Sequence, residues 1–340
     1  SDLSMMSANL TATMNGTQTS NCFNHEAKII GMSIFHCLIF VVSLIGNITI
    51  GTVVFKTKSM QRPINFFIVN MAMSDLLFPI FQSPYIVINI NTGSWLIDGH
   101  LGQALCKLRP FFPNISGLVS VQSLVLIAVD RFGAVVFPLR SPLISSKQCR
   151  FFILATWIIG AVVHIPDLLT FKLVESLERL SCERKWKGTF GGSFPFRNYG
   201  VPMLVVFWYF PLVLIATLYL AIFLKLKSQN IPGEESANAR AQHLRRERNV
   251  LKMSIAIVST FAVCWMPVTI RWLLLFYPLD STMTVSCGFQ HFADVAVSLA
   301  HLNCAINPVI CLIFSGNYRR RLKNLLGCCP ACTRDRKSVV

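Results

Sequence analysis

Charged residues are scarce in this sequence. Only 14% of its 340 residues are Asp, Glu, Lys or Arg, whereas 53% are hydrophobic. An ordinary soluble domain carries roughly 25% charged residues. The shortage of charge therefore excludes a soluble domain of ordinary composition and indicates a protein that folds in a membrane.

The sequence also lacks the patterns of two other functional classes. It contains no nucleophile spaced with a base, no metal-ligand set and no glycine-rich phosphate loop, so we expect no enzymatic activity. Internal repeats and broken helices, which are typical of transporters, are not found either.

Long apolar runs are abundant. A helix needs roughly 20 apolar residues to cross a bilayer, and seven windows of about that length lack uncompensated charge. They are residues 28–55, 64–90, 103–136, 148–169, 199–226, 249–277 and 289–314. Lipid cannot hydrogen-bond the backbone, and barrel strands would be shorter and alternating, so each window is predicted to be a helix. The predicted fold class is an all-α membrane protein with a seven-transmembrane helix bundle.

The basic residues predict the orientation of the chain. About two thirds of the 31 lysines and arginines fall on the side that successive crossings make cytoplasmic under the positive-inside rule. The net charge of +16 is interpreted as attraction to acidic lipid rather than to nucleic acid. Asn9 and Asn15 begin Asn-X-Thr glycosylation acceptors in the amino-terminal segment, which is predicted to be extracellular. No cleavable signal peptide precedes them, so the first helix is expected to act as its own signal anchor.

Four of the twelve cysteines fall on the outer side, where the compartment is oxidising. Cys106 begins the third predicted helix, and a bridge to Cys182 would hold the second outer loop over the mouth of the bundle. Cys22 and Cys287 are the remaining outer pair. The alternative is that these thiols are free or mispaired.

Asp75 lies in the middle of the second predicted helix. A carboxylate isolated in hydrocarbon is either protonated or holds a cation. Ser120, Asn303 and Asn307 lie at comparable depth and provide oxygen ligands for a small hard ion such as sodium. The alternative is a protonated Asp75 in a water-filled polar cluster.

The sixth predicted helix has the features of a hinge and a lock. Pro267 removes a backbone donor and is expected to kink the helix beside Trp265, which would form the floor of a pocket. Arg131 lies beside Asp130 at the inner end of the third helix, within salt-bridge reach of Glu247. Breaking that pair would release the sixth helix, as a two-state switch requires. The alternative for Glu247 is a solvated charge among neighbouring arginines.

Each predicted helix carries a short motif. In chain order they are Gly46-Asn47, Asp75, Asp130-Arg131-Phe132, Trp157, Pro211 with Tyr219, Phe261 with Cys264-Trp265-Met266-Pro267, and Asn307-Pro308. Together they resemble the rhodopsin-like (class A) G protein-coupled receptors. The resemblance implies a receptor that binds a ligand in its outer half and opens its cytoplasmic half to a heterotrimeric G protein, with arrestin as a further partner.

The seventh helix departs from the family pattern. The family's Asn-Pro-x-x-Tyr here ends in Cys311, so the tyrosine hydroxyl that would meet Tyr219 through water is missing. The alternative function is therefore a constitutively active or scavenging receptor with a non-peptide ligand or no signalling ligand. Pro211, Val121 and Phe261 resemble the family's packing relay, with plain interhelical packing as the alternative.

Two ligand classes are excluded by single residues. Amine receptors carry an aspartate where this chain has Pro113, and opsins carry a lysine where it has His301. Residues 106–112, 120–124 and 182–186 resemble the neuropeptide-receptor branch, which implies a peptide ligand, and residues 173–186 are predicted to form a hairpin over the pocket. The candidate ligand contacts near the outer helix ends are Gln82, Arg109, Glu183, Arg271, Trp272, His291 and Asp294. The alternative for each is a solvated rim residue.

The carboxy-terminal segment begins with an amphipathic pattern. Residues 315–326 are predicted to form an eighth helix on the inner leaflet. Cys328, Cys329 and Cys332 resemble palmitoylation sites, with unmodified thiols as the alternative, and the last three residues fit a PDZ domain. The expected organisation is an extracellular segment (1–27), a receptor domain (28–315) and a helix with a cytoplasmic tail (316–340), located in the plasma membrane.

Overall fold

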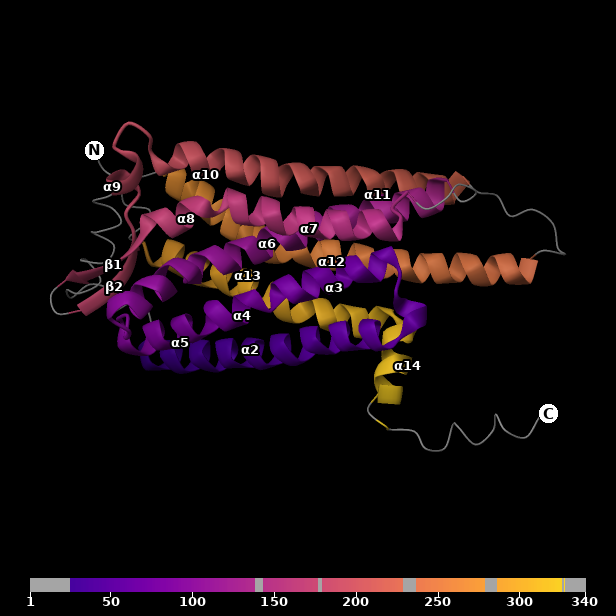
Figure 1. The fold of residues 1–340 in the computed structure, drawn as a ribbon, viewed down its shortest axis with the longest axis horizontal. Coiled ribbons are helices and arrows are strands. Elements are labelled where there is room, and N and C mark those ends of the chain that lie inside the picture. The colour runs from indigo at the N-terminus through magenta and orange to yellow at the C-terminus, as the bar shows by residue number, and fades with distance from the viewer. Residues whose placement is uncertain are drawn as a thin grey trace.

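Seven helical segments are long and apolar enough to cross a membrane in the computed structural model, which describes residues 25–137, 143–176, 179–228, 237–278, 286–325 and 327. They are Glu26–Lys56, Pro63–Thr92, Gly99–Val136, Ser146–Thr170, Phe196–Lys227, Leu251–Phe276 and Cys287–Phe314. The segments run alongside one another in a bundle (Figure 1). Each matches one predicted window, which confirms the predicted fold class.

Four spans are single helices and three are divided. The single helices are α2 (His25–Lys56), α6 (Gly99–Val136), α12 (Ala237–Phe276) and α13 (Cys287–Phe314). The second span comprises α3 (Pro63–Asp75), α4 (Leu77–Phe81) and α5 (Ser83–Thr92), and the fourth comprises α7 (Ser146–Val163) and α8 (Ile165–Thr170). The fifth comprises α10 (Phe196–Leu204), a π-helical turn (Val205–Tyr209) and α11 (Phe210–Ser228).

These breaks correct the sequence analysis, which found no broken helices. Prolines account for the breaks in the second and fourth spans because a proline has no N–H to donate to the carbonyl four residues earlier. Pro79 cannot bond the carbonyl of Asp75, where α3 ends. Pro84 and Pro166 lie at the starts of α5 and α8 in the same way. Asp75 is therefore the last residue of α3.

A β-hairpin covers one end of the bundle. Strands β1 (Phe171–Ser176) and β2 (Arg179–Arg184) pair antiparallel, with Leu173 opposite Cys182, and α9 (Trp186–Phe190) follows. The disulfide between Cys106 and Cys182 ties β2 to α6. The backbone N–H of Trp95 also donates to the carbonyl of Leu180 at 2.8 Å. The predicted hairpin and the first predicted disulfide are thus present, and Figure 1 shows this hairpin beyond the outer helix ends.

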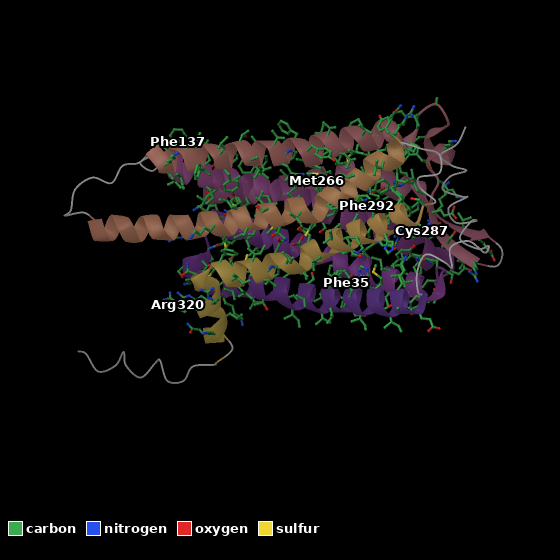
Figure 2. All side chains as sticks on the ribbon, turned by 180° about the vertical axis from the view of Figure 1, so that it is seen from behind. Phe35, Phe137, Met266, Cys287, Phe292 and Arg320 are labelled. Carbon is green, nitrogen blue, oxygen red and sulfur yellow. A yellow bond between two sulfur atoms is a disulfide. The ribbon has the colours of Figure 1, made fainter. Side chains whose placement is uncertain are left out.

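The opposite end of the bundle carries a short helix, α14 (Gly316–Leu325), that turns away from α13 (Figure 1). Its Tyr318 is 1% exposed and packs in the same buried cluster as Cys311. The arginines of α14, including the labelled Arg320, lie at this end (Figure 2). A 3-10 turn (Lys58–Met60) joins α2 to α3 there. The predicted amphipathic eighth helix therefore exists as α14.

The third span lies at the centre of the bundle. In its most apolar part 67% of residues are buried, compared with 17% in the first span. Exposed apolar side chains cover the outward faces, such as Ile45 of α2, which is 64% exposed. This distribution suits a bundle whose outer surface contacts lipid.

Candidate functional site

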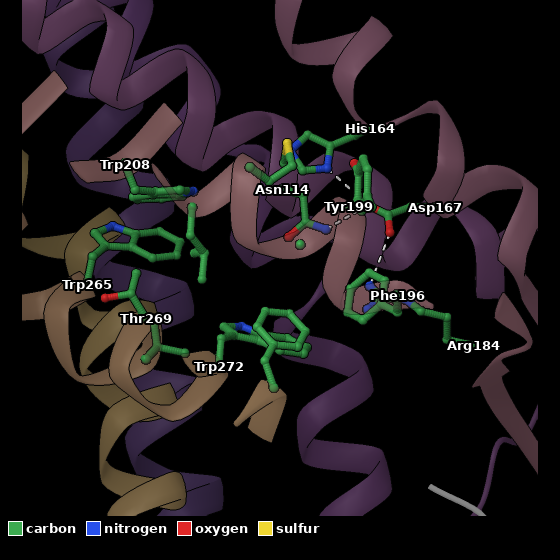
Figure 3. A pocket seen from close by; sticks show the side chains of 15 residues that line it. Asn114, His164, Asp167, Arg184, Phe196, Tyr199, Trp208, Trp265, Thr269 and Trp272 are labelled. Atoms are coloured by element: carbon green, nitrogen blue, oxygen red, sulfur yellow. Dashed lines mark hydrogen bonds and ion pairs between the residues drawn. The ribbon is translucent and has the colours of Figure 1, made fainter. Parts of the chain in front are cut away.

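The half of the bundle next to the β-hairpin contains a cavity of about 120 Å³ (Figure 3). An engineered apolar cavity of about 150 Å³ binds one benzene molecule, so this space fits roughly one aromatic ring. It lies between α6, α8, β2, α10, the π-helical turn and α12. The lining residues are Asn114, His164, Asp167, Arg184, Phe196, Tyr199, Gly200, Met203, Leu204, Trp208, Trp265, Val268, Thr269, Trp272 and Phe276.

One side of the cavity is aromatic. The ring centroids of Trp208 and Trp265 are 4.4 Å apart, and both rings line the cavity (Figure 3). Gly117 of α6 allows this packing because a Cβ there would lie 2.9 Å from Trp208 and 3.2 Å from Trp265. Trp265 was expected at the pocket floor, whereas Trp208 was missed because nothing in its local sequence separates it from lipid-facing aromatic residues.

The other side of the cavity is polar and is centred on Asp167, which is 3% exposed. Its carboxylate accepts hydrogen bonds from Asn114 Nδ2 at 2.8 Å and Arg184 Nη2 at 3.1 Å, and His164 Nδ1 lies 3.1 Å away. Asp167 was not among the ligand contacts predicted from the sequence. Its position near the end of an apolar window was the signal that marked it.

Arg184 compensates the charge of Asp167. Its guanidinium carbon also lies 4.2 Å from the ring centroid of Phe196 and 4.8 Å from that of Phe171. Burial lowers the pKa of Arg184, and the neighbouring Asp167 carboxylate opposes that effect. Because the carboxylate already has three polar partners, the cavity offers no free negative charge to a cationic group.

Among the seven predicted ligand contacts, Trp272 lines the cavity and the other six do not. Asp294 pairs with Lys28 at 2.5 Å. Arg271 places its guanidinium carbon 5.5 Å from the ring centroid of Trp272. The remaining four are Gln82, Arg109, Glu183 and His291.

Glu183 of β2 is held by two neighbours. Lys185 Nζ donates to its carboxylate at 2.6 Å and Ser181 Oγ donates at 2.8 Å. Burial by itself would raise the pKa of Glu183, but these hydrogen bonds and the charge of Lys185 outweigh it and lower the pKa.

The predicted ion cluster assembles around Asp75. Ser120 Oγ donates to Asp75 Oδ1 at 2.9 Å, and Asn307 Nδ2 donates to Asp75 Oδ2 at 2.8 Å. Asn303 lies one helical turn before Asn307 on α13 and is 3% exposed. The side-chain oxygens of both asparagines are buried and have no hydrogen-bond partner. Three of the four predicted residues are therefore directly bonded, and the fourth leaves an acceptor oxygen unpaired.

The predicted switch residues occupy the inner half. Arg131 Nη2 pairs with Asp130 Oδ2 at 2.6 Å. Glu247 belongs to α12, but its side chain lies outside the described residues, so the predicted lock remains a prediction. Phe261 lies 6.0 Å from Trp265, ring centroid to ring centroid.

The other predicted switch positions follow the course of α11, α12 and α13. Pro267 and Pro308 both lie inside helices that continue past them. A Cβ at Gly46 would lie 2.8 Å from Pro308, so only glycine fits between α2 and α13 there. Tyr219 is partly buried and Cys311 is 1% exposed.

Several predicted sites fall on residues whose structure is not described. They are Asn9, Asn15, Cys22, Cys328, Cys329 and Cys332. Cys287 is described and is disulfide-bonded, while its expected partner Cys22 lies outside the described residues. Within the described part of the chain, no three His, Cys, Asp or Glu residues are grouped to hold a metal ion.

Comparison with known proteins gives consistent matches. The family model for the 7 transmembrane receptor (rhodopsin family) matches residues 46–310. A QRFP-like peptide receptor from Branchiostoma floridae is 30% identical over 309 residues, which cover 87% of this chain and 77% of that protein. A substance-K receptor from Bos taurus is 26% identical over 86% of this chain and 74% of its own length. A substance-P receptor from Mus musculus is 26% identical over 94% of this chain and 76% of its own length.

Proposed function

The chain belongs to the rhodopsin family of seven-transmembrane receptors, and we propose that its ligand is an extracellular peptide that activates a heterotrimeric G protein. The observation that carries the proposal is a cavity with room for one side chain, which lies beneath a hairpin that the Cys106–Cys182 disulfide holds to α6. A cavity of about 120 Å³ holds one side chain, while β1 and β2 offer backbone and polar groups to the residues that follow it. The likeness to a protein named as a peptide receptor supports the same ligand class.

The cavity is best suited to an uncharged aromatic side chain. Trp265 and Trp272 line it, and Asp167 is already compensated by Arg184. A lysine or arginine side chain would be buried there without a counter-ion, which is costly. An aromatic ring would gain both apolar burial and ring contacts.

Signalling would pass from the cavity to the cytoplasmic end through α12. A side chain that enters the cavity presses on Trp265, whose ring packs against Trp208 in a tilted arrangement and neighbours Phe261. Pro267 provides a hinge just outside Trp265, so the inner part of α12 would swing away from Arg131. The pair of Arg131 with Glu247 would hold the resting state.

Nucleotide exchange in reconstituted membranes tests this function. Synthetic peptides with an aromatic carboxy-terminal residue are expected to stimulate exchange, and Arg131→Ala is expected to abolish the response. Trp272→Ala should weaken it at least ten-fold, whereas Phe210→Ala, at a 63% exposed position on α11, should not. Peptides that bind this receptor but never stimulate exchange would favour the scavenging alternative instead.

We further propose that the Asp75 cluster binds a sodium ion. Sodium prefers oxygen ligands, and the unpaired side-chain oxygens of Asn303 and Asn307 would join Asp75 and Ser120. Thermal unfolding in sodium chloride and in choline chloride measures the effect without any peptide. The midpoint should rise with sodium in the wild type and not in Asp75→Asn. An equal rise in both proteins would exclude the site.

The proposed orientation places the hairpin outside the cell and α14 at the inner face of the plasma membrane. It rests on the distribution of basic residues along the chain. Glycosidase treatment of intact cells should shift the mobility of the wild-type protein but not of a variant with both Asn9 and Asn15 replaced by Gln. The same orientation places Cys328, Cys329 and Cys332 on the cytoplasmic side, and we propose that they are palmitoylated there.

A further inference from the structure

Arg109 is a partly buried arginine on α6, three residues after Cys106. Its guanidinium carbon lies 4.1 Å from the ring centroid of Tyr85 and 5.7 Å from that of Phe171. Its Nε atom is buried and has no hydrogen-bond partner. The guanidinium thus packs against two aromatic rings.

The carboxylates that could neutralise Arg109 are engaged elsewhere. Asp167 pairs with Arg184 and Asp294 pairs with Lys28. Glu183 pairs with Lys185, and Asp98 accepts a hydrogen bond from the backbone N–H of Gly99 at the start of α6. Over the described residues, no carboxylate lies within 4.0 Å of the Arg109 guanidinium.

An unpaired buried cation is costly unless something neutralises it. Cation–π contacts with Tyr85 and Phe171 recover part of the cost. They leave the hydrogen-bonding capacity of the guanidinium unused. A guanidinium binds a carboxylate through two parallel hydrogen bonds, which adds both energy and directional specificity.

Arg109 is a near neighbour of the cavity. Both guanidiniums lie near Phe171. The Phe171 ring centroid is 5.7 Å from the guanidinium carbon of Arg109 and 4.8 Å from that of Arg184. Arg184 lines the cavity, and its own Nε atom is also buried without a partner. Because Asp167 compensates only one of these two arginines, the region keeps one net positive charge.

We propose that Arg109 binds a carboxylate of the peptide whose aromatic side chain occupies the cavity. This assignment rests on the proposed function. The carboxylate is either the free carboxy terminus of the aromatic residue or the side chain of an adjacent Asp or Glu, because both present the same planar oxygen pair. Peptides that are basic or uncharged at this position are selected against, since they leave the guanidinium unpaired.

Thermal unfolding of the purified full-length receptor with four small probes tests the assignment. The two acidic probes are N-acetyl-phenylalanine, with a terminal carboxylate, and N-acetyl-glutamyl-phenylalaninamide, with a side-chain carboxylate. The two controls are N-acetyl-phenylalaninamide, which is neutral, and N-acetyl-lysyl-phenylalaninamide, which is cationic. A ligand that binds only the folded receptor raises its unfolding midpoint, and titration gives a dissociation constant.

At least one acidic probe should bind ten-fold or more tightly than both controls, and the better one identifies the source of the carboxylate. Arg109→Gln should remove that preference. Arg109→Lys should retain only part of it, because lysine cannot form the paired hydrogen bonds. Arg197→Gln, at an exposed position on α10, is the matched control and should behave like the wild type. Equal binding of acidic and neutral probes, an unchanged preference in Arg109→Gln, or no binding of any probe would overturn the assignment.

G protein exchange, measured separately with active peptides, distinguishes this inference from the proposed function. Carboxylate-dependent stabilisation without any peptide-stimulated exchange would support the anion site and contradict the receptor function. Peptide-stimulated exchange of equal potency in the wild type and Arg109→Gln would support the receptor function and contradict the anion site.

Discussion

Arg184 Nη2 at the end of β2 and Asp167 Oδ1 in α8 lie 3.1 Å apart and join the outer hairpin to the fourth span. The side chains are 20% and 4% exposed, so the pair is mostly removed from water. It fixes the end of β2 against the cavity and neutralises the one carboxylate in the cavity lining. Both the position of the hairpin and the charge preference of the cavity therefore depend on this contact.

Replacement of Asp167 by Asn is expected to destabilise the receptor. The substitution leaves Arg184 buried without a counter-ion, and removing one partner of a buried ion pair costs about 3–5 kcal/mol. Thermal unfolding should show a lower midpoint. The double variant Asp167→Asn with Arg184→Met should recover part of the loss, whereas Glu175→Gln, at an exposed position on β1, should have little effect. A double variant no more stable than the single one would contradict the ion-pair explanation.

Replacement of Gly117 by Ala is expected to disturb the aromatic side of the cavity. The added methyl group would lie 2.9 Å from Trp208 and 3.2 Å from Trp265, so these rings must shift toward the cavity. Overpacking of this kind costs about 1–3 kcal/mol. The free energy of unfolding and the potency of active peptides should both fall. Gly31→Ala provides the control because no atom lies within 4 Å of its added methyl group.

The disulfide between Cys106 and Cys182 spans 76 residues, and its loss releases the hairpin from α6. Loop entropy predicts a loss of about 4 kcal/mol when Cys106 and Cys182 are both replaced by Ser. Unfolding of the double variant and the wild type measures that loss, and peptide potency should fall with it. Cys37→Ser, at an exposed free cysteine on α2, serves as the control. Unchanged peptide potency in the double variant would show that the hairpin plays no part in binding.

The order of β2 is expected to depend on pH through Glu183. Its pKa is lowered below 4.5 by Lys185 and Ser181, so the folded hairpin favours the charged form. That stabilisation is complete above the unfolded pKa of about 4.5 and is lost as pH falls through the folded pKa. Hydrogen exchange of residues 181–185, corrected for intrinsic rates, should show weaker protection at pH 3.5 than at pH 6. In Glu183→Gln the protection should be weaker at both values and should not change between them.

The seven spans were predictable because crossing a membrane imposes a length and an apolar composition that one window of sequence displays. The hairpin was predicted over residues 173–186, and its strands pair over Phe171–Ser176 and Arg179–Arg184. The helix breaks at Pro79 and Pro166 were not anticipated, although every proline lacks a backbone N–H donor. Whether a helix ends at a proline or continues past it, as α12 does at Pro267, depends on neighbouring helices.

The candidate ligand contacts were chosen by depth alone, and only Trp272 lines the cavity. Depth is a one-dimensional property, whereas lining a cavity also requires a direction around the helix and a packing partner. Asp167 of α8 and Trp208 of the π-helical turn both line the cavity. No local pattern distinguishes such residues from their lipid-facing neighbours.

The sequence by itself determined the number of crossings and the family motifs, because each follows from composition or from short spacings. Only the tertiary structure decided which charges meet. It paired Asp167 with Arg184 and Asp75 with Asn307, residues 17 and 232 positions apart, and it placed Arg109 between two rings with no carboxylate of the described residues in ion-pair contact. The physical reason is that the cost of a buried charge depends on its neighbours in space, and these are set by how the helices pack.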